Sequence, residues 1–146
     1  LTTENYGSMF NIVVKGNRPL YVQGLEFHTN LSTDVEYYVY TLSGGFQFGV
    51  YDLSKWTLVA SGKVMGKGPS TATPIPSFNL MIPAGTLQGL YVTLANSKML
   101  NVGTDVTMGE TYVDDEYTSV QVGVGVSGFP LTSDTPFVSP RAWYGT

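Results

Sequence analysis

The sequence predicts an all-β protein: a single antiparallel β-sandwich, jelly-roll-like, with about nine or ten strands. Three observations support this fold class. Hydrophobic residues alternate with a period of two in most segments, which are rich in β-branched and aromatic side chains. Turn-forming residues return about every 8 to 12 positions, a spacing typical of sandwiches. No window sustains the i, i+3, i+4, i+7 spacing of a long helix.

Three of the expected strands lie in the first half of the chain. The segment SMFNIVVKG (8–16) alternates Met-Asn-Val with Phe-Ile-Val. In VEYYVYTL (35–42) the two valines share one face with Tyr37, while Tyr38 and Tyr40 share the other face. In KWTLVASGKV (55–64), Trp56 and Leu58 share a face that we expect to be buried in the core.

Two further strands are expected in the second half, in LYVTLA (90–95) and SVQVGVGV (119–126). The second has the cleanest alternation: Val120, Val122 and Val124 share a face that we expect to be buried. Gly123 and Gly125 leave the opposite face nearly bare. Such a face lets another layer, chain or glycan approach closely.

A chain of 146 residues fits one domain, which we expect to span residues 1–146. Residues 1–7 precede the first clear strand and have no evident place in the core, so they could form an N-terminal arm. No apolar run approaches the roughly 20 residues of a membrane span. The absence of cysteine excludes disulfides and thiol nucleophiles.

Charged residues make up only 12% of the chain, and its net charge is −4. Nucleic-acid binding needs clustered Lys and Arg to neutralise phosphates, and the seven basic residues here are scattered. The surface must therefore be covered largely by uncharged polar residues and tyrosine. Such a surface suits an extracellular or cell-surface module.

Eight stretches occur in an order that carries a resemblance: GSMFNIVV, GLEFHTN, VEYYVYT, WTLVASGKVMGKG, TPIPSF, IPAGTLQGLYVTL, VQVGVG and PRAWYG. Over nearly all of residues 7–145 the chain resembles an uncharacterised all-β domain of secreted or cell-surface proteins of algae and marine microbes. It departs from that pattern at Glu26, Leu90 and Tyr144, where the family usually has Asp, Phe and Asn. The resemblance implies an extracellular building-block domain and identifies no catalytic residues.

The only histidine, His28, lies two residues after Glu26 on a predicted strand, so both side chains point to the same face. Such a pair could act as a general acid and base, or as half of a metal site. A zinc site would need further histidines, and a serine hydrolase would need a G-x-S-x-G turn. We interpret the pair as structural and predict a protein that is not an enzyme, without catalytic residues or cofactors.

Two other polar features are candidate sites. Asn30 opens the only N-x-[ST] sequon, so we predict a glycan on Asn30 if the chain is secreted by a eukaryote. Asp114, Asp115 and Glu116 are the centre of an acidic stretch that could supply calcium ligands. The favoured alternative is a solvated acidic turn between two strands, and we predict no metal.

The predicted function is that of an extracellular structural or adhesive subunit that self-assembles into a fibre or layer, with copies of itself as partners. If the strands at 8–14 or 119–126 lie at sheet edges, they contain no interior Lys or Pro to block strand addition. Tyr38, Tyr40, Gly123 and Gly125 form the expected assembly or ligand face. The alternative is a carbohydrate-binding module with glycan partners, because several aromatic residues, Phe46 and Tyr51 among them, crowd residues 37–56.

Overall fold

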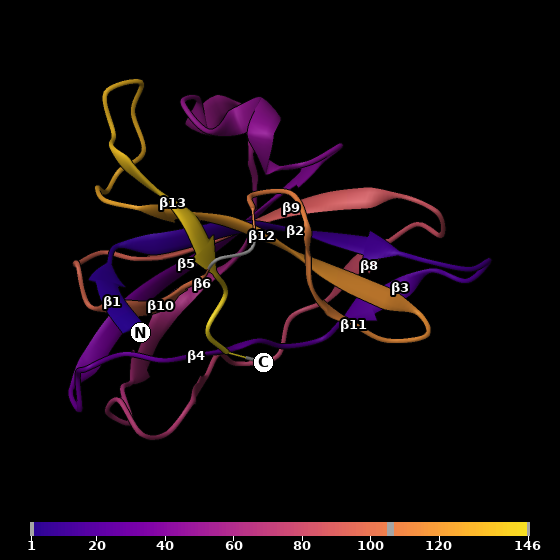
Figure 1. Ribbon diagram of the computed structural model, residues 1–146. Helices are drawn as coiled ribbons and strands as arrows, with labels where there is room; N and C mark the ends of the chain where they lie inside the picture. The colour runs from indigo at the N-terminus through magenta and orange to yellow at the C-terminus, as the bar shows by residue number, and fades with distance from the viewer. Residues whose placement is uncertain (1, 105–106, 146) are drawn as a thin grey trace.

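The computed structural model describes residues 2–104 and 107–145. Within these residues the only helical segments are two short 3-10 turns, η1 (Phe46–Gly49) and η2 (Leu53–Lys55). All strand pairs are antiparallel, which confirms the predicted all-β sandwich (Figure 1). In the described part of the chain, no helix has the length and apolar character needed to cross a membrane.

Nine strands form one large sheet, in the order β1-β10-β13-β12-β2-β9-β5-β6, with β11 paired to β12. Four strands of only two or three residues form two small sheets, β3-β8 and β4-β7. The strands are β1 (Thr2–Asn5), β2 (Gly7–Val14), β3 (Leu20–Val22), β4 (Glu26–Phe27), β5 (Asp34–Ser43), β6 (Thr57–Met65), β7 (Thr73–Pro74), β8 (Leu80–Ile82), β9 (Leu87–Leu94), β10 (Met99–Gly103), β11 (Thr111–Asp114), β12 (Thr118–Val126) and β13 (Phe137–Ala142).

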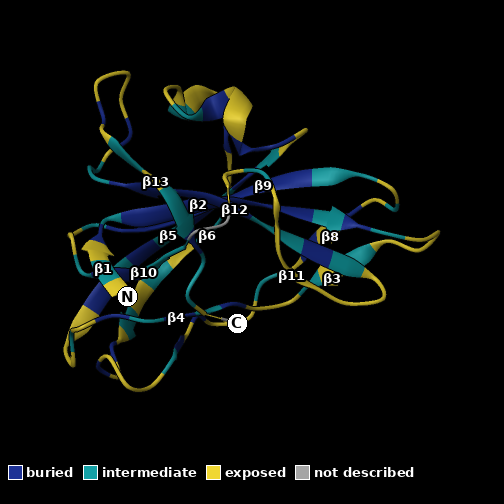
Figure 2. Ribbon diagram, viewed as in Figure 1, coloured by how far each residue is buried: buried dark blue, intermediate teal, exposed yellow. Residues whose placement is uncertain are grey.

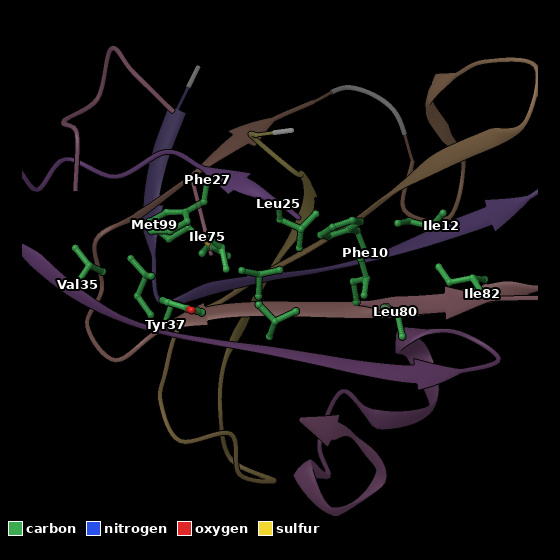
Figure 3. Packing of buried hydrophobic residues seen from close by; sticks show 14 of the residues in the cluster. Phe10, Ile12, Leu25, Phe27, Val35, Tyr37, Ile75, Leu80, Ile82 and Met99 are labelled. Carbon is green, nitrogen blue, oxygen red and sulfur yellow. The ribbon is translucent and has the colours of Figure 1, made fainter. Parts of the chain in front are cut away.

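The two small sheets form a thin second layer over one face of the large sheet. The larger hydrophobic core lies between these layers, as Figure 3 shows for Phe10 of β2 and its neighbours. Phe27 of β4 and Ile82 of β8 enter this core from the second layer, and Leu90 enters it from the centre of the large sheet. Burial of these apolar side chains holds the two layers together.

A second core covers the opposite face of the large sheet. Met9, Tyr91 and Val124 project from the sheet, while Phe46 and Trp56 come from the segment that carries η1 and η2. Strands β2 and β9 are therefore covered on both faces, and Figure 2 shows them as the most buried part of the molecule. The prediction that Trp56 is buried is confirmed.

The expectation that Val120, Val122 and Val124 share one buried face is wrong. Between the pairs Gln121–Asn11 and Val124–Met9, β12 has one residue more than β2, which makes a bulge. The extra residue reverses the alternation. As a result Val120 packs half-buried against the larger core, whereas Val124 belongs to the second core on the other face.

Leu58 was also expected in the core, but its side chain is 52% exposed. The pairing of β5 with β6 shifts register between Val39 and Tyr40, and Val59 is left without a partner. This bulge places Leu58 opposite Tyr40, at the margin of the sheet where little covers it.

The edges of the sheet differ from those that the sequence suggested. Strands β2 and β12, which were considered as open edges, lie inside the sheet. Its edge strands are β1 and β6, at the two ends of the order, and β11, which pairs with β12 alone. The expected N-terminal arm is β1, which pairs with β10 of the same chain. The buried Asn5 side chain fixes it there by donating from Nδ2 to Asn101 Oδ1 over 2.6 Å.

Candidate functional site

The residues of the predicted assembly face do not form an open surface. Strands β2 and β9 separate Tyr38 and Tyr40 on β5 from Gly123 and Gly125 on β12. The Tyr38 ring lies 5.0 Å from that of Phe129, and both tyrosines are only half exposed. Both glycines are buried, so nothing outside the chain can approach them as the bare strand face suggested.

His28 makes packing contacts with the C-terminal segment. Its ring stacks on Tyr144 with the centroids 3.9 Å apart and the planes at 9°. Its Nδ1 atom lies 3.3 Å from the carbonyl oxygen of Pro69. Glu26 sits half-buried on β4, where its pairing partner is Pro74 of β7. His28 is thus held by packing and polar contacts within its own chain. Within the described residues, no three His, Asp or Glu side chains are grouped to hold a metal.

The acidic stretch forms a hairpin turn between β11 and β12. Asp114 pairs with the ammonium group of Lys15, and this hydrogen bond holds the pKa of the Asp114 carboxyl below its ordinary value. Asp115 accepts the backbone N–H of Thr118 over 2.8 Å, which lowers the pKa of its own carboxyl. Glu116 is exposed at the turn. Two of the three candidate calcium ligands, Asp114 and Asp115, are thus engaged in stabilising the hairpin, as Asx-type turns do.

Asn30 is exposed in the bend that follows β4. Its Nδ2 donates to Glu4 Oε2 over 2.7 Å, and this bond lowers the pKa of the Glu4 carboxyl. The sequon therefore lies on an accessible surface, where a glycan would not have to enter the core.

A groove on the second-core face has the features of a ligand site. Its volume is about 350 Å³, within the range of roughly 300 to 1,000 Å³ of small-molecule sites. η1, the 107–110 turn, β12 and β13 meet there, in the upper part of Figure 1. The lining residues are Phe46, Gln47, Val50, Tyr51, Met108, Val124, Phe137 and Ser139.

The groove has a buried floor and aromatic walls. Phe46 and Val124 are 0% and 4% exposed, so they form the floor. The Tyr51 ring meets that of Phe137 edge to face, with centroids 5.2 Å apart, although Tyr51 itself is 57% exposed. Tyrosine in this setting offers a flat apolar ring together with a hydroxyl.

Asn11 connects the floor to the rim of the groove. It is a buried amide in the middle of β2, and its Oδ1 accepts the backbone N–H of Phe46 over 2.8 Å. Gly45, which has a φ of 119°, lets η1 come this close, because a side chain there would be strained. One backbone bond from Asn11 thus fixes the start of η1 against the sheet.

Phe46 and Tyr51 belong to the aromatic run that the sequence singles out, whereas Asn11, Gln47 and Phe137 were not predicted as site residues. The available signal was Asn11, an amide within an otherwise apolar strand, since a buried amide needs partners. The sequence around Phe137 does not indicate that this residue lines a groove, because its position in the wall depends on where β13 lies.

A larger hollow of about 540 Å³ lies between residues 14–20 and the start of β12. Its walls are mainly the exposed loop at 16–19, and Lys15 on its wall is already paired with Asp114. Val14 is the one buried residue of its lining, whereas the smaller groove has both Phe46 and Val124. The smaller groove is therefore the better candidate, because its buried floor and the Tyr51–Phe137 ring contact are in place before any ligand binds.

No family model matches this sequence, and no relative was found among curated proteins. The candidate site therefore has to be judged on its geometry and chemistry alone.

Proposed function

We propose that this domain is a non-catalytic extracellular module that binds a glycan in the groove between η1 and β13. The observation that carries the proposal is the exposed Tyr51 ring, held edge to face by Phe137 above a buried apolar floor. A sugar ring has an apolar face that can stack on an aromatic ring, and hydroxyl groups that can meet the polar rim. Gln47 and Ser139 supply that rim.

The chemistry of the lining supports binding and gives no support to catalysis. No carboxylate, imidazole, ammonium or guanidinium group is among the described residues that line the groove. Glycoside hydrolysis uses a pair of carboxyl groups, and general acid–base catalysis needs a group that titrates near the working pH. A neutral groove of this kind also favours an uncharged ligand.

Self-assembly into a fibre or layer, the other function expected from the sequence, has less support. The longest of the edge strands, β6, has nine residues, against four each in β1 and β11, but it carries Lys63 near its centre and the bulge at Val59. A lysine and a bulge on an edge strand are two common obstacles to strand addition. We therefore place glycan binding first and assembly second.

The test uses two tyrosines with equal exposure. Tyr51 lines the groove and Tyr21 lies on β3 of the second layer, and each is 57% exposed. Calorimetric titration with a panel of neutral oligosaccharides should find one that binds. Tyr51→Ala should weaken its binding about tenfold or more, which corresponds to about 1.4 kcal/mol, and Tyr21→Ala should leave it unchanged. The absence of any binding, or equal effects of the two substitutions, would count against the proposal.

A further inference from the structure

We infer that the groove recognises an N-acetylated sugar, with the acetamido carbonyl bound at the Gln47 rim and the methyl group on the apolar floor. This inference rests on the proposed glycan-binding function and specifies its ligand. It follows from the hydrogen bonds of one buried residue, Asn11, because these bonds determine which atoms of the rim can donate a hydrogen bond to a ligand.

The orientation of the Asn11 amide is fixed by a group that can only donate. The backbone N–H of Phe46 points at one end of the amide over 2.8 Å, so that end must be the oxygen Oδ1. The other end is therefore the amino group Nδ2. Asn11 is 1% exposed, so this amide has no water-facing alternative.

The Asn11 amino group in turn orients two glutamines. It donates to Gln47 Oε1 over 3.0 Å and to Gln121 Oε1 over 3.3 Å. Both glutamines must present their oxygen to Asn11, because two amino groups facing each other cannot form a hydrogen bond. Their Nε2 amino groups consequently point away from Asn11, and in the described structure neither donates to a protein acceptor.

The Nε2 amino group of Gln47 is thus a hydrogen-bond donor at the rim whose orientation is set before binding. A ligand gains most from such a donor if it brings an acceptor, because a second donor would meet it unfavourably. The lining residues include no cation to offset a carboxylate or sulfate, so the acceptor should be neutral. A carbonyl oxygen satisfies both conditions.

The floor beside this rim selects a small apolar group. Phe46, Val50 and Val124 line it, and Met108 adds a flexible thioether at the edge. An acetamido group combines a neutral carbonyl with a methyl group about one bond away. A simple hexose has only hydroxyl groups, which can donate or accept and leave an apolar floor unfilled.

The experiment compares matched oligosaccharides by calorimetric titration at equal chain length. Trimers of N-acetylglucosamine should bind the wild-type chain at least about tenfold more tightly than trimers of glucose. In Gln47→Glu, one carboxylate oxygen still accepts from Asn11 while the other replaces the outward amino group. This variant should lose most of the preference for the N-acetylated trimer. Gln23→Glu, an equal charge change at an exposed position outside the groove, should keep the preference.

The outcomes separate this inference from the broader proposal. Equal binding of the two trimers, or tighter binding of the glucose trimer, overturns the inference and leaves glycan binding intact. Equal preferences in Gln47→Glu and Gln23→Glu overturn it as well, because the rim donor would then have no part in recognition. If neither trimer nor any other glycan binds, both the inference and the proposed function fail. Unchanged thermal unfolding of the two variants serves as the folding control.

Discussion

Gly123→Ala distinguishes the face that the sequence predicts from the one in the structure. If Gly123 lay on a bare strand face awaiting a partner, an added methyl group would hardly affect stability. In the structure a Cβ atom at this position would overlap the carbonyl oxygen of Met9. It would also lie 2.8 Å from the Met9 carbonyl carbon and 2.9 Å from Cα of Phe10. These are backbone atoms of β2, which cannot rotate out of the way.

The size of the effect follows from the displacement that these contacts require. Ordinary contact begins near 3.4 Å, so the two strands must separate by at least 0.6 Å at the Met9 carbonyl carbon. Strand β12 lies between β2 and β13, so the movement strains hydrogen bonds on both sides. Overpacking costs about 1–3 kcal/mol, and each buried backbone group left unpaired costs about 1–3 kcal/mol more. We expect the free energy of unfolding to decrease by about 3–5 kcal/mol. This is a large part of the roughly 5–15 kcal/mol by which a typical domain is stable.

Urea denaturation followed by tryptophan fluorescence measures this change, provided that the slope with denaturant stays constant. Gly24→Ala is the matched control, since nothing lies within 4 Å of its Cβ position and its φ is outside the left-handed region. The control should stay within about 1 kcal/mol of wild type, because Gly-to-Ala changes at compatible sites are mild or slightly stabilising. If Gly123→Ala also stays within that range, the close approach of β12 to β2 is wrong and the bare-face interpretation regains its basis.

Three further predictions concern single side chains. Burial raises the pKa of Tyr91 to about 12. The contribution of Tyr91 to the free energy of unfolding should therefore be fully present below pH 10, where the tyrosines of the unfolded chain are neutral. It should fall as the pH rises toward 12. Tyr91→Phe should reduce this loss in urea denaturation at pH 11, and an unchanged loss would contradict the assignment to Tyr91. Mass analysis of the chain secreted from eukaryotic cells should find a glycan on Asn30; an unmodified peptide at full occupancy would disprove it. Light scattering should show more self-association for Lys63→Val than for wild type if the charge of Lys63 prevents strand addition at the β6 edge. Equal association of the two chains would show that it does not.

The fold class and the approximate strand positions could be predicted from the sequence because both depend on local information. The period-two pattern and the turn residues act over a few positions, and they located β2, β5, β9 and β12. The burial of Trp56 was also predicted correctly. A large aromatic residue within an alternating segment has few other stable locations.

The faces of β5 were predicted correctly, but those of β12 and of the start of β6 could not be, because the face of a residue depends on the register with its neighbours. One extra residue in β12 moves Val124 to the opposite face from Val120, and one extra residue in β6 leaves Leu58 exposed. Neither bulge has a signature in the local pattern. The same is true of the edges, since the order of strands decides that β6 is open while β2 is enclosed.

Composition and periodicity were enough to predict antiparallel strands with little surface charge and no cysteine chemistry. The location of the candidate ligand groove depends instead on the tertiary structure. The groove joins Gln47, Met108 and Phe137, three side chains from segments far apart along the chain. Their meeting depends on the hydrogen bond from Phe46 to Asn11 and on the strand order that places β13 beside β12. Long-range pairing of this kind is fixed by the packing of the whole sheet, and no short stretch of sequence specifies it.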